Sequence, residues 1–225
     1  SDLIMDFLNT HLLSTILCLP VISALVILFI PNEQVKAIRW TALLSSILPF
    51  IFTMLLWSRF DSNAGFQFQE QAIWYEAIHS TFHIGVDGLS LSMVILTTLL
   101  TPLAILASFS VNDKVKAYMM LFLFLETGML GVFLAMDLLI FFLFWEIGLV
   151  PMYFLINQWG SPKGEREIWA GVKVSARNYA SLKFMVYTMA GSLGLLLAIQ
   201  LLGVLFQRSE EHTSELQSHS FISYA

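Results

Sequence analysis

The sequence predicts an all-α membrane protein, a bundle of about six transmembrane helices. Hydrophobic residues make up 57% of the 225 residues and charged residues only 12%, and the mean hydropathy is +0.77. A soluble domain of this composition would have too little polar surface. The apolar residues also gather in runs of about 20, the length of a helix that crosses ~30 Å of hydrocarbon, whereas barrel strands would be shorter and alternating.

The predicted spans follow one another along the chain, separated by polar connections. The first run is too long for the core of a signal peptide and lacks a basic flank and a small-residue cleavage site, so it is predicted to remain as a span. Pro20, Pro49 and Pro102 lie in or near the spans and predict kinks, which transmembrane helices tolerate. The spans are residues 12–30, 40–57, 89–108, 117–135, 138–158 and 182–206.

The basic residues predict the orientation of the bundle. They gather in the connections after the first, third and fifth spans, while the opposite side has only Arg59 before residue 208. Because the connections on the inner side of a membrane are rich in lysine and arginine, the N-terminus and residues 61–87 are predicted to lie outside. The inner basic residues are Lys36, Arg39, Lys114, Lys116, Lys163, Arg166, Lys173, Arg177 and Lys183.

Two carboxylates lie inside predicted spans, where an ionisable side chain usually faces the protein interior and handles charge. Glu146 follows Asp137, at the outer end of its span, by nine residues, and Glu126 follows Ala117, at the inner end of its span, by nine residues. Each is therefore about 13 Å deep, close to the midplane. The short connection between the two helices makes them candidates for a shared or relayed proton. A buried structural hydrogen bond is the alternative for both, and a local packing role for Glu126.

Three further charged residues have structural alternatives. Asp137 and Asp87 precede spans and are predicted to be helix N-caps rather than proton carriers. Lys183 lies at the inner start of the last span, where it either extends its ammonium group to the interface or takes part in proton transfer.

No metal site or bound cofactor is predicted. His79 and His83 have the i,i+4 spacing of helical metal ligands, but they lie in a loop without evident carboxylate partners. Cys18 is the only cysteine and lies in an apolar run, which excludes an internal disulfide and a thiolate cluster and predicts a packing role. An intramembrane hydrolase would need a nucleophile or metal ligands beside the two glutamates, and no second motif supports one.

Both ends of the chain are expected to be foreign to the protein. Residues 208–225 replace an apolar helix abruptly with polar sequence, and read as codons they resemble a translated sequencing adapter, with residues 219–221 at its variable index. Residues 1–4 precede Met5 and resemble upstream read-through. We therefore expect the membrane protein to comprise residues 5–207, and His212 and His219 not to be metal ligands.

Three segments resemble a known family. They are IGVDGLSL, GVFLAMDLLIFFLFWEIGLVPMYFLINQWG and ASLKFMVYT, and the block from Phe144 to Gly160 is highly specific. These segments resemble the family of subunit M, also called chain 4, of proton-translocating NADH-quinone oxidoreductase, respiratory complex I. The resemblance covers residues 5–206, and the fit to the related subunits of multi-subunit Na⁺/H⁺ antiporters is looser after residue 149.

This resemblance implies an antiporter-like fold of about fourteen helices in two inverted repeats, of which the sequence has the first six. It implies a proton-translocating subunit of an enzyme complex, with Glu146 as the motif glutamate of the fifth helix, Lys183 as the lysine of the sixth, and a partner lysine on the seventh. NADH, FMN, iron–sulfur clusters and quinone are expected in other subunits. The expected partners are the other membrane-arm subunits, the lipid bilayer and protons, with no nucleic acid, in an energy-coupling membrane such as the bacterial plasma membrane. A subunit of a Na⁺/H⁺ antiporter and a purely structural assembly subunit are the alternatives.

Overall fold

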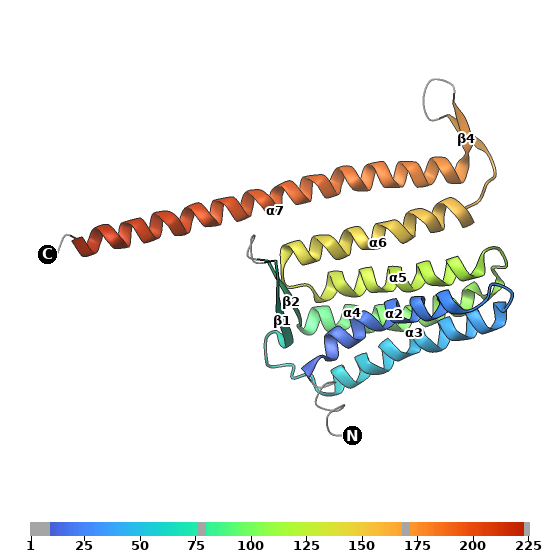
Figure 1. Cartoon of the computed structure of the whole chain (residues 1–225), viewed down its shortest axis with the longest axis horizontal. Helices are drawn as coiled ribbons and strands as arrows, with labels where there is room; N and C mark the ends of the chain where they lie inside the picture. Colours follow the sequence, from blue (N-terminus) through green and yellow to red (C-terminus); the bar gives the residue numbers. More distant parts are fainter. Residues whose placement is uncertain (1–9, 76–79, 168–171, 223–225) are drawn as a thin grey trace. The chain divides into compact units, whose positions relative to one another are not determined.

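A computed structural model describes residues 10–75, 80–167 and 172–222 of the chain. Its six long helices, shown in Figure 1, are each long and apolar enough to cross a membrane, which confirms the predicted fold class. The helices are α2 (Leu12–Phe29), α3 (Val35–Ser58), α4 (Gly88–Ala107), α5 (Val115–Leu134), α6 (Leu138–Trp159) and α7 (Ala176–Ile222). The chain divides into two compact units, residues 1–185 and 186–225, so the last part of α7 forms a unit by itself.

Most helix bounds agree with the predicted spans, but α3 and α7 begin about five residues earlier than predicted, and α7 ends at Ile222 instead of at residue 206. The first five residues of α3 include Lys36 and Arg39, and the first turns of α7 contain Arg177 and Asn178. Polar residues of this kind are typical of the membrane–water interface, where a helix can extend beyond its apolar run. A span predicted from the apolar run alone therefore begins too late. The helices also continue through Pro20, Pro49, Pro102 and Pro151.

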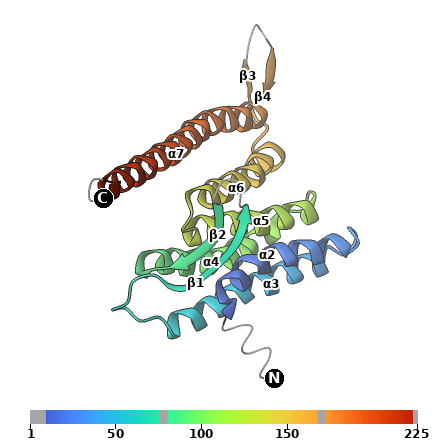
Figure 2. The same cartoon turned by 60° about the vertical axis from the view of Figure 1, so that its left-hand side comes forward.

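Two antiparallel hairpins, which the sequence analysis did not predict, connect the helices. The larger pairs β1 (Gln67–Tyr75) with β2 (Ser80–Val86), and the smaller pairs β3 (Glu165–Glu167) with β4 (Lys173–Ser175). The β1–β2 hairpin lies at the end of the bundle where α2, α4 and α6 begin, as Figures 1 and 2 show. Ile84 of β2 forms a β-bridge with Ala135, and the Met136 N–H donates to the His83 carbonyl at 2.9 Å. The hairpin is therefore attached to the turn between α5 and α6.

The apolar core of the first unit consists of two clusters at different depths. One lies toward the β1–β2 hairpin and contains Leu13, Ile84, Val94, Leu130 and Leu134 among its residues. The other lies toward the opposite end, where α3 and α5 begin, and contains residues of α2, α3, α4 and α5. It includes Ala24, Ile27, Ile38, Ile105, Met119 and Leu123. Between the clusters, each of these four helices contributes buried polar residues, and this layer contains Glu126.

Candidate functional site

The packing of α5 against α6 decides where the two buried carboxyl groups lie. The helices touch through glycine: a Cβ on Gly128 would be 2.7 Å from the Gly148 Cα, with only backbone on the other side. A Cβ on Gly131 would overlap the ring of Phe144. Gly128 and Gly131 therefore mark the side of α5 that faces α6, and Phe144 and Gly148 mark the side of α6 that faces α5.

Glu126 and Glu146 lie on the far sides of these helices. Two residues along a helix correspond to a rotation of about 200°, so Glu126 lies nearly opposite Gly128 and Glu146 nearly opposite Gly148. Because α5 and α6 are antiparallel, the two glutamates also differ in depth by about 6 Å, four residues at 1.5 Å each. This arrangement does not support the expected direct sharing of a proton between the two glutamates. Their depths are similar, but their side chains lie on opposite sides of the α5–α6 pair.

Glu126 lies in the interior of the bundle. It is 0% exposed and falls on the same side of α5 as the buried residues Leu123 and Leu130, which belong to different core clusters. Neither of its carboxyl oxygens makes a hydrogen bond with the described part of the chain. The layer between the clusters also contains buried hydroxyl groups from α2, α3 and α4: Ser23, Ser46, Thr53, Thr97, Thr98 and Thr101.

The hydroxyl groups of this layer offer acceptors rather than donors. Each donates its hydrogen to a backbone carbonyl of its own helix, as Thr98 does to Val94 at 2.8 Å and Thr101 to Thr97 at 2.9 Å, so only the oxygen lone pairs remain available. Pro20, Pro49 and Pro102 lack an N–H, which leaves further carbonyls as acceptors. A neutral carboxylic acid can donate to such a layer, whereas a carboxylate would find no donor there.

Glu146 has a different environment. Its side chain is half-buried, and its Oε1 atom is buried without a hydrogen bond within the described chain. It lies on the side of α6 remote from α5, next to the exposed Trp145 and Ile147. An unpartnered carboxyl group in the middle of an apolar helix is costly unless a charged or polar group approaches it.

Lys183 lies on the second turn of α7, in the first unit, and is exposed. Its Nζ atom is 5.8 Å from the centre of the Tyr179 ring. The Asn157 amide of α6 donates to the Ser181 hydroxyl at 3.1 Å, so these two residues lie at the same level. Counted at 1.5 Å per residue from this level, Lys183 lies about 3 Å closer to the hairpin end of the bundle, and Glu146 lies about 16 Å closer to it. The lysine and Glu146 therefore differ in depth by about 13 Å.

The two aspartates are helix caps, as predicted. Asp87 forms a capping box with Ser90 at the start of α4: its Oδ1 accepts from the Ser90 N–H at 2.7 Å. The hydrogen bonds from the Ser90 backbone and hydroxyl lower the pKa of Asp87. Asp137 accepts from the N–H groups of Leu139 and Ile140 at the start of α6.

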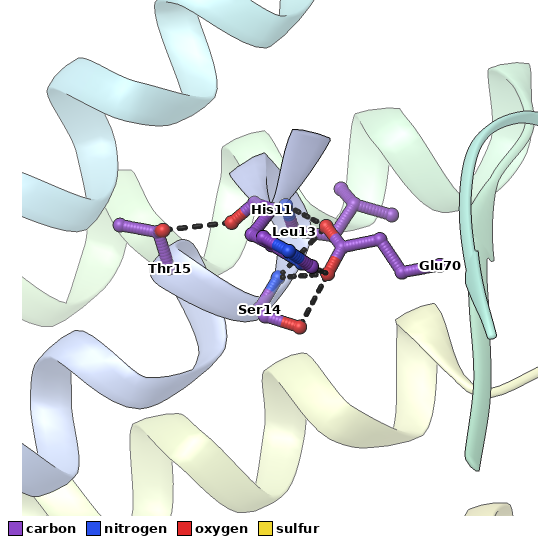
Figure 3. Close-up of polar contacts among 5 residues, drawn as sticks. All are labelled: His11, Leu13, Ser14, Thr15 and Glu70. Carbon is purple, nitrogen blue, oxygen red and sulfur yellow. Dashed lines mark hydrogen bonds and ion pairs between the residues drawn. The ribbon is translucent and has the colours of Figure 1, made fainter. Parts of the chain in front are cut away.

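Glu70 is a polar residue that the sequence analysis missed. Its carboxylate, on β1, accepts hydrogen bonds from the Leu13 N–H at 2.7 Å and from the Ser14 N–H and hydroxyl at the start of α2, as Figure 3 shows. The Nδ1 atom of His11 lies 3.6 Å from the Glu70 Oε2 atom. His11 itself, at the N-cap position, makes no side-chain cap bond, so Glu70 caps α2 from another element. Its separation of more than fifty residues from α2 leaves no local signal in the sequence.

No metal site emerges among the described residues, where no group of three or more histidine, cysteine, aspartate or glutamate side chains could hold an ion. His83 lies on β2 and makes a 3.1 Å hydrogen bond with Gln69. His79 lies outside the described residues.

The chain is similar to proteins of one family. The sequence model of the family described as NADH:quinone oxidoreductase/Mrp antiporter, TM, matches residues 135–217. NADH-ubiquinone oxidoreductase chain 4 of Marchantia polymorpha is 41% identical over 207 residues, which are 91% of this chain and 38% of the relative. NADH-quinone oxidoreductase subunit M of Rhodobacter capsulatus is 39% identical over 194 residues, 84% of this chain and 35% of the relative. The chain belongs to this chain 4/subunit M family.

The chain thus spans less than two fifths of the length of these family members. A solved structure agrees with the assignment at the level of the fold. A chain of respiratory complex I from Thermus thermophilus with bound NADH matches with a TM-score of 0.66 and 24% identity, over 83% of this chain and 34% of that chain.

Proposed function

We propose that this chain is part of a proton-translocating membrane subunit of an NADH-quinone oxidoreductase and that Glu146 carries the titratable charge of its proton path. The observation that carries the proposal is the position of the Glu146 carboxyl group, in the middle of a membrane-spanning helix with a buried, unpartnered oxygen. Such a group is rarely kept inside a membrane unless it handles charge.

The direction in which Glu146 faces determines what its partner would be. It lies away from α5, so Glu126 is not that partner, and a cation would approach from an element packed on the other side of α6. The family resemblance supplies a lysine on a later helix. A cation beside Glu146 favours the carboxylate, and its withdrawal favours proton uptake, so movement of one charge would switch the protonation of the other.

Glu126 and Lys183 take separate places in this proposal. We propose that Glu126 exchanges a proton within the polar layer of α2 to α5, whose hydroxyl and carbonyl oxygens can accept a hydrogen bond from a neutral acid. Lys183 lies near the basic end of the bundle, where it would set the local potential at the inner opening of the path. Neither role requires direct contact with Glu146.

The proposal assigns NADH, FMN, iron–sulfur clusters and quinone to other subunits. The partners are further membrane-arm subunits and the surrounding bilayer, and the chain contributes to the reductase as a subunit rather than as its redox centre. From the distribution of the basic residues we propose that the N-terminus lies on the outer side of an energy-coupling membrane, the bacterial plasma membrane.

A subunit of a Na⁺/H⁺ antiporter is the second candidate, because the description of the matching family includes the Mrp antiporter. The specific block from Phe144 to Gly160 and the named relatives favour the oxidoreductase. Dependence of ion uptake on NADH oxidation would separate the two, since an antiporter exchanges ions without an electron donor.

The test is substitution at the position of Glu146 in the assembled oxidoreductase of a bacterial relative. Glu146→Gln keeps the size and hydrogen-bonding capacity of the side chain but removes its charge, so we expect normal assembly on native gels and loss of most coupled NADH–quinone reductase activity. Glu146→Asp keeps the charge with one methylene less reach and should retain part of the activity. Wild-type coupled activity in Glu146→Gln would show that the carboxyl group is structural.

A further inference from the structure

A cavity lies at the basic end of the bundle, away from both glutamates. It has a volume of about 530 Å³ and is formed where the connection between α2 and α3 meets the start of α5. This volume is in the range of small-molecule sites in proteins. It is lined by Leu28, Asn32, Val35, Asn112, Lys114, Val115, Lys116, Ala117 and Met120.

The lining has two chemically different parts. One part is lined by two positively charged residues and two amides, Lys114, Lys116, Asn32 and Asn112, and none of the described carboxylate residues lines it. Leu28, Val35, Val115 and Met120 provide an apolar wall. A ligand that suits both parts has an anionic head and a hydrocarbon chain.

The two lysines are held in place and keep donors to spare. Lys116 Nζ donates to the carbonyls of Leu28 and Ile30, at 2.7 and 2.8 Å, and thereby closes the end of α2 against α5. Lys114 Nζ donates to the Gln158 side chain at 2.9 Å. Because an ammonium group has three N–H donors, these contacts leave one on Lys116 and two on Lys114.

The surroundings of the cavity place it at the membrane–water interface. Arg39 holds the loop beside it by donating to the Val111 carbonyl and to the Asn112 side chain, at 2.7 and 2.8 Å. Trp159 at the end of α6 donates to the Asp113 carbonyl at 2.8 Å, and Trp40 is exposed on α3. Tryptophan is enriched at this level of a membrane, and basic pockets between helices on the positive side bind anionic lipid head groups.

We propose that this cavity binds one anionic phospholipid of the inner leaflet, with its phosphate at the part lined by Lys114, Lys116 and Asn112 and an acyl chain along Leu28 and Met120. The site is independent of the proton path, so it stands or falls separately from the proposed function. The lipid would join the α2–α3 connection to the start of α5 and stabilise this end of the bundle.

The experiment measures lipid retention by the 225-residue chain, purified in neutral detergent, by native mass spectrometry. Phosphatidylglycerol should be retained more than phosphatidylcholine. Lys114→Gln, which leaves the Lys116 contacts to α2 intact, should lower phosphatidylglycerol retention about fivefold, the usual effect of one cation near an anionic membrane surface. Met120→Trp fills the apolar part without changing any charge and should also lower retention. The matched control is Lys163→Gln with Lys173→Gln, exposed lysines outside the cavity, which should retain the lipid.

Four results would overturn the proposal, three from lipid retention and one from competition with phosphate. One is equal retention of phosphatidylglycerol and phosphatidylcholine, and another is unchanged retention in both Lys114→Gln and Met120→Trp. The third is loss of the lipid in the control pair, which would show attraction by overall charge. Inorganic phosphate at 10-fold excess should not displace the lipid, and displacement would assign the site to a free anion instead.

Discussion

Replacement of Gly128 by alanine is predicted to destabilise the contact between α5 and α6. The effect should be larger than that of the same replacement at Gly148, the other glycine of this contact whose new Cβ would meet backbone. The new Cβ would lie 2.7 Å from the Gly148 Cα, where 3.4 Å is an ordinary contact, so the helices would have to separate by about 0.7 Å. Neither atom can swing away, since the opposing atoms are backbone. A gap of 0.5–1 Å forfeits a quarter to a half of the dispersion energy of a contact, and overpacking typically costs about 1–3 kcal/mol.

The better helix propensity of alanine offsets up to about 1 kcal/mol of this cost, which leaves a net loss of about 1–2 kcal/mol. Thermal unfolding of the purified chain in detergent, followed by tryptophan fluorescence, should therefore show a Tm lower by about 2–8 °C. Gly148→Ala is the matched comparison on the partner helix: its Cβ would meet only the Gly128 Cα at 3.9 Å and should be tolerated. Gly191→Ala has nothing within 4 Å and serves as the control. Unchanged Tm in Gly128→Ala, or a larger loss in Gly148→Ala, would refute the helix contact and the positions of Glu126 and Glu146 deduced from it.

Three further outcomes are expected. Glu70→Ala removes the cap of α2 and should lower the free energy of unfolding by about 1–2 kcal/mol in the same unfolding assay, while Glu165→Ala on the exposed β3 strand should have no effect. The pKa of Asp87 is lowered in the folded state, so its carboxylate stabilises the fold at a pH above its ordinary pKa, and this stabilisation is lost as the pH falls through the folded-state pKa. Asp87→Asn should therefore flatten the decline in the free energy of unfolding below about pH 4. An unchanged decline would contradict this. In an assembled relative, Glu126→Gln should leave the pH dependence assigned to Glu146 unchanged, because the two carboxyl groups lie on opposite sides of the α5–α6 pair; a shifted profile would show that they interact.

The helices could be predicted from the sequence because continuous apolar runs of membrane length have few alternative structures. The β1–β2 hairpin could not, since its strands lie in a connection where residues 67–75 mix polar and apolar side chains without clear alternation. It forms because Ile84 and Val86 are buried against the ends of α2 and α4 and because Glu70 reaches the first turn of α2. These contacts are distant in sequence.

The candidate site was predictable in depth and not in rotation. Counting residues from the ends of the spans places Glu126 and Glu146 at similar depth near the midplane, and the contact between Gly128 and Gly148 separates them by about 6 Å along the helix axes. Which side of each helix they occupy depends on Gly128, Gly131, Phe144 and Gly148, whose contacts the sequence does not specify. The acceptor-rich layer around the depth of Glu126 was missed for a similar reason, since its threonines and serines lie on three other helices.

Proton uptake per NADH oxidised measures directly whether Glu146 carries protons through the membrane. The measurement uses reconstituted vesicles of the assembled oxidoreductase of a bacterial relative, normalised to the amount of complex, with Glu146→Gln compared with wild type and with Glu126→Gln. Glu146→Gln is expected to take up clearly fewer protons per NADH, or to lose proton uptake and NADH oxidation together where the two are tightly coupled, while Glu126→Gln has the smaller effect. Wild-type proton uptake and wild-type NADH oxidation in assembled Glu146→Gln would contradict it.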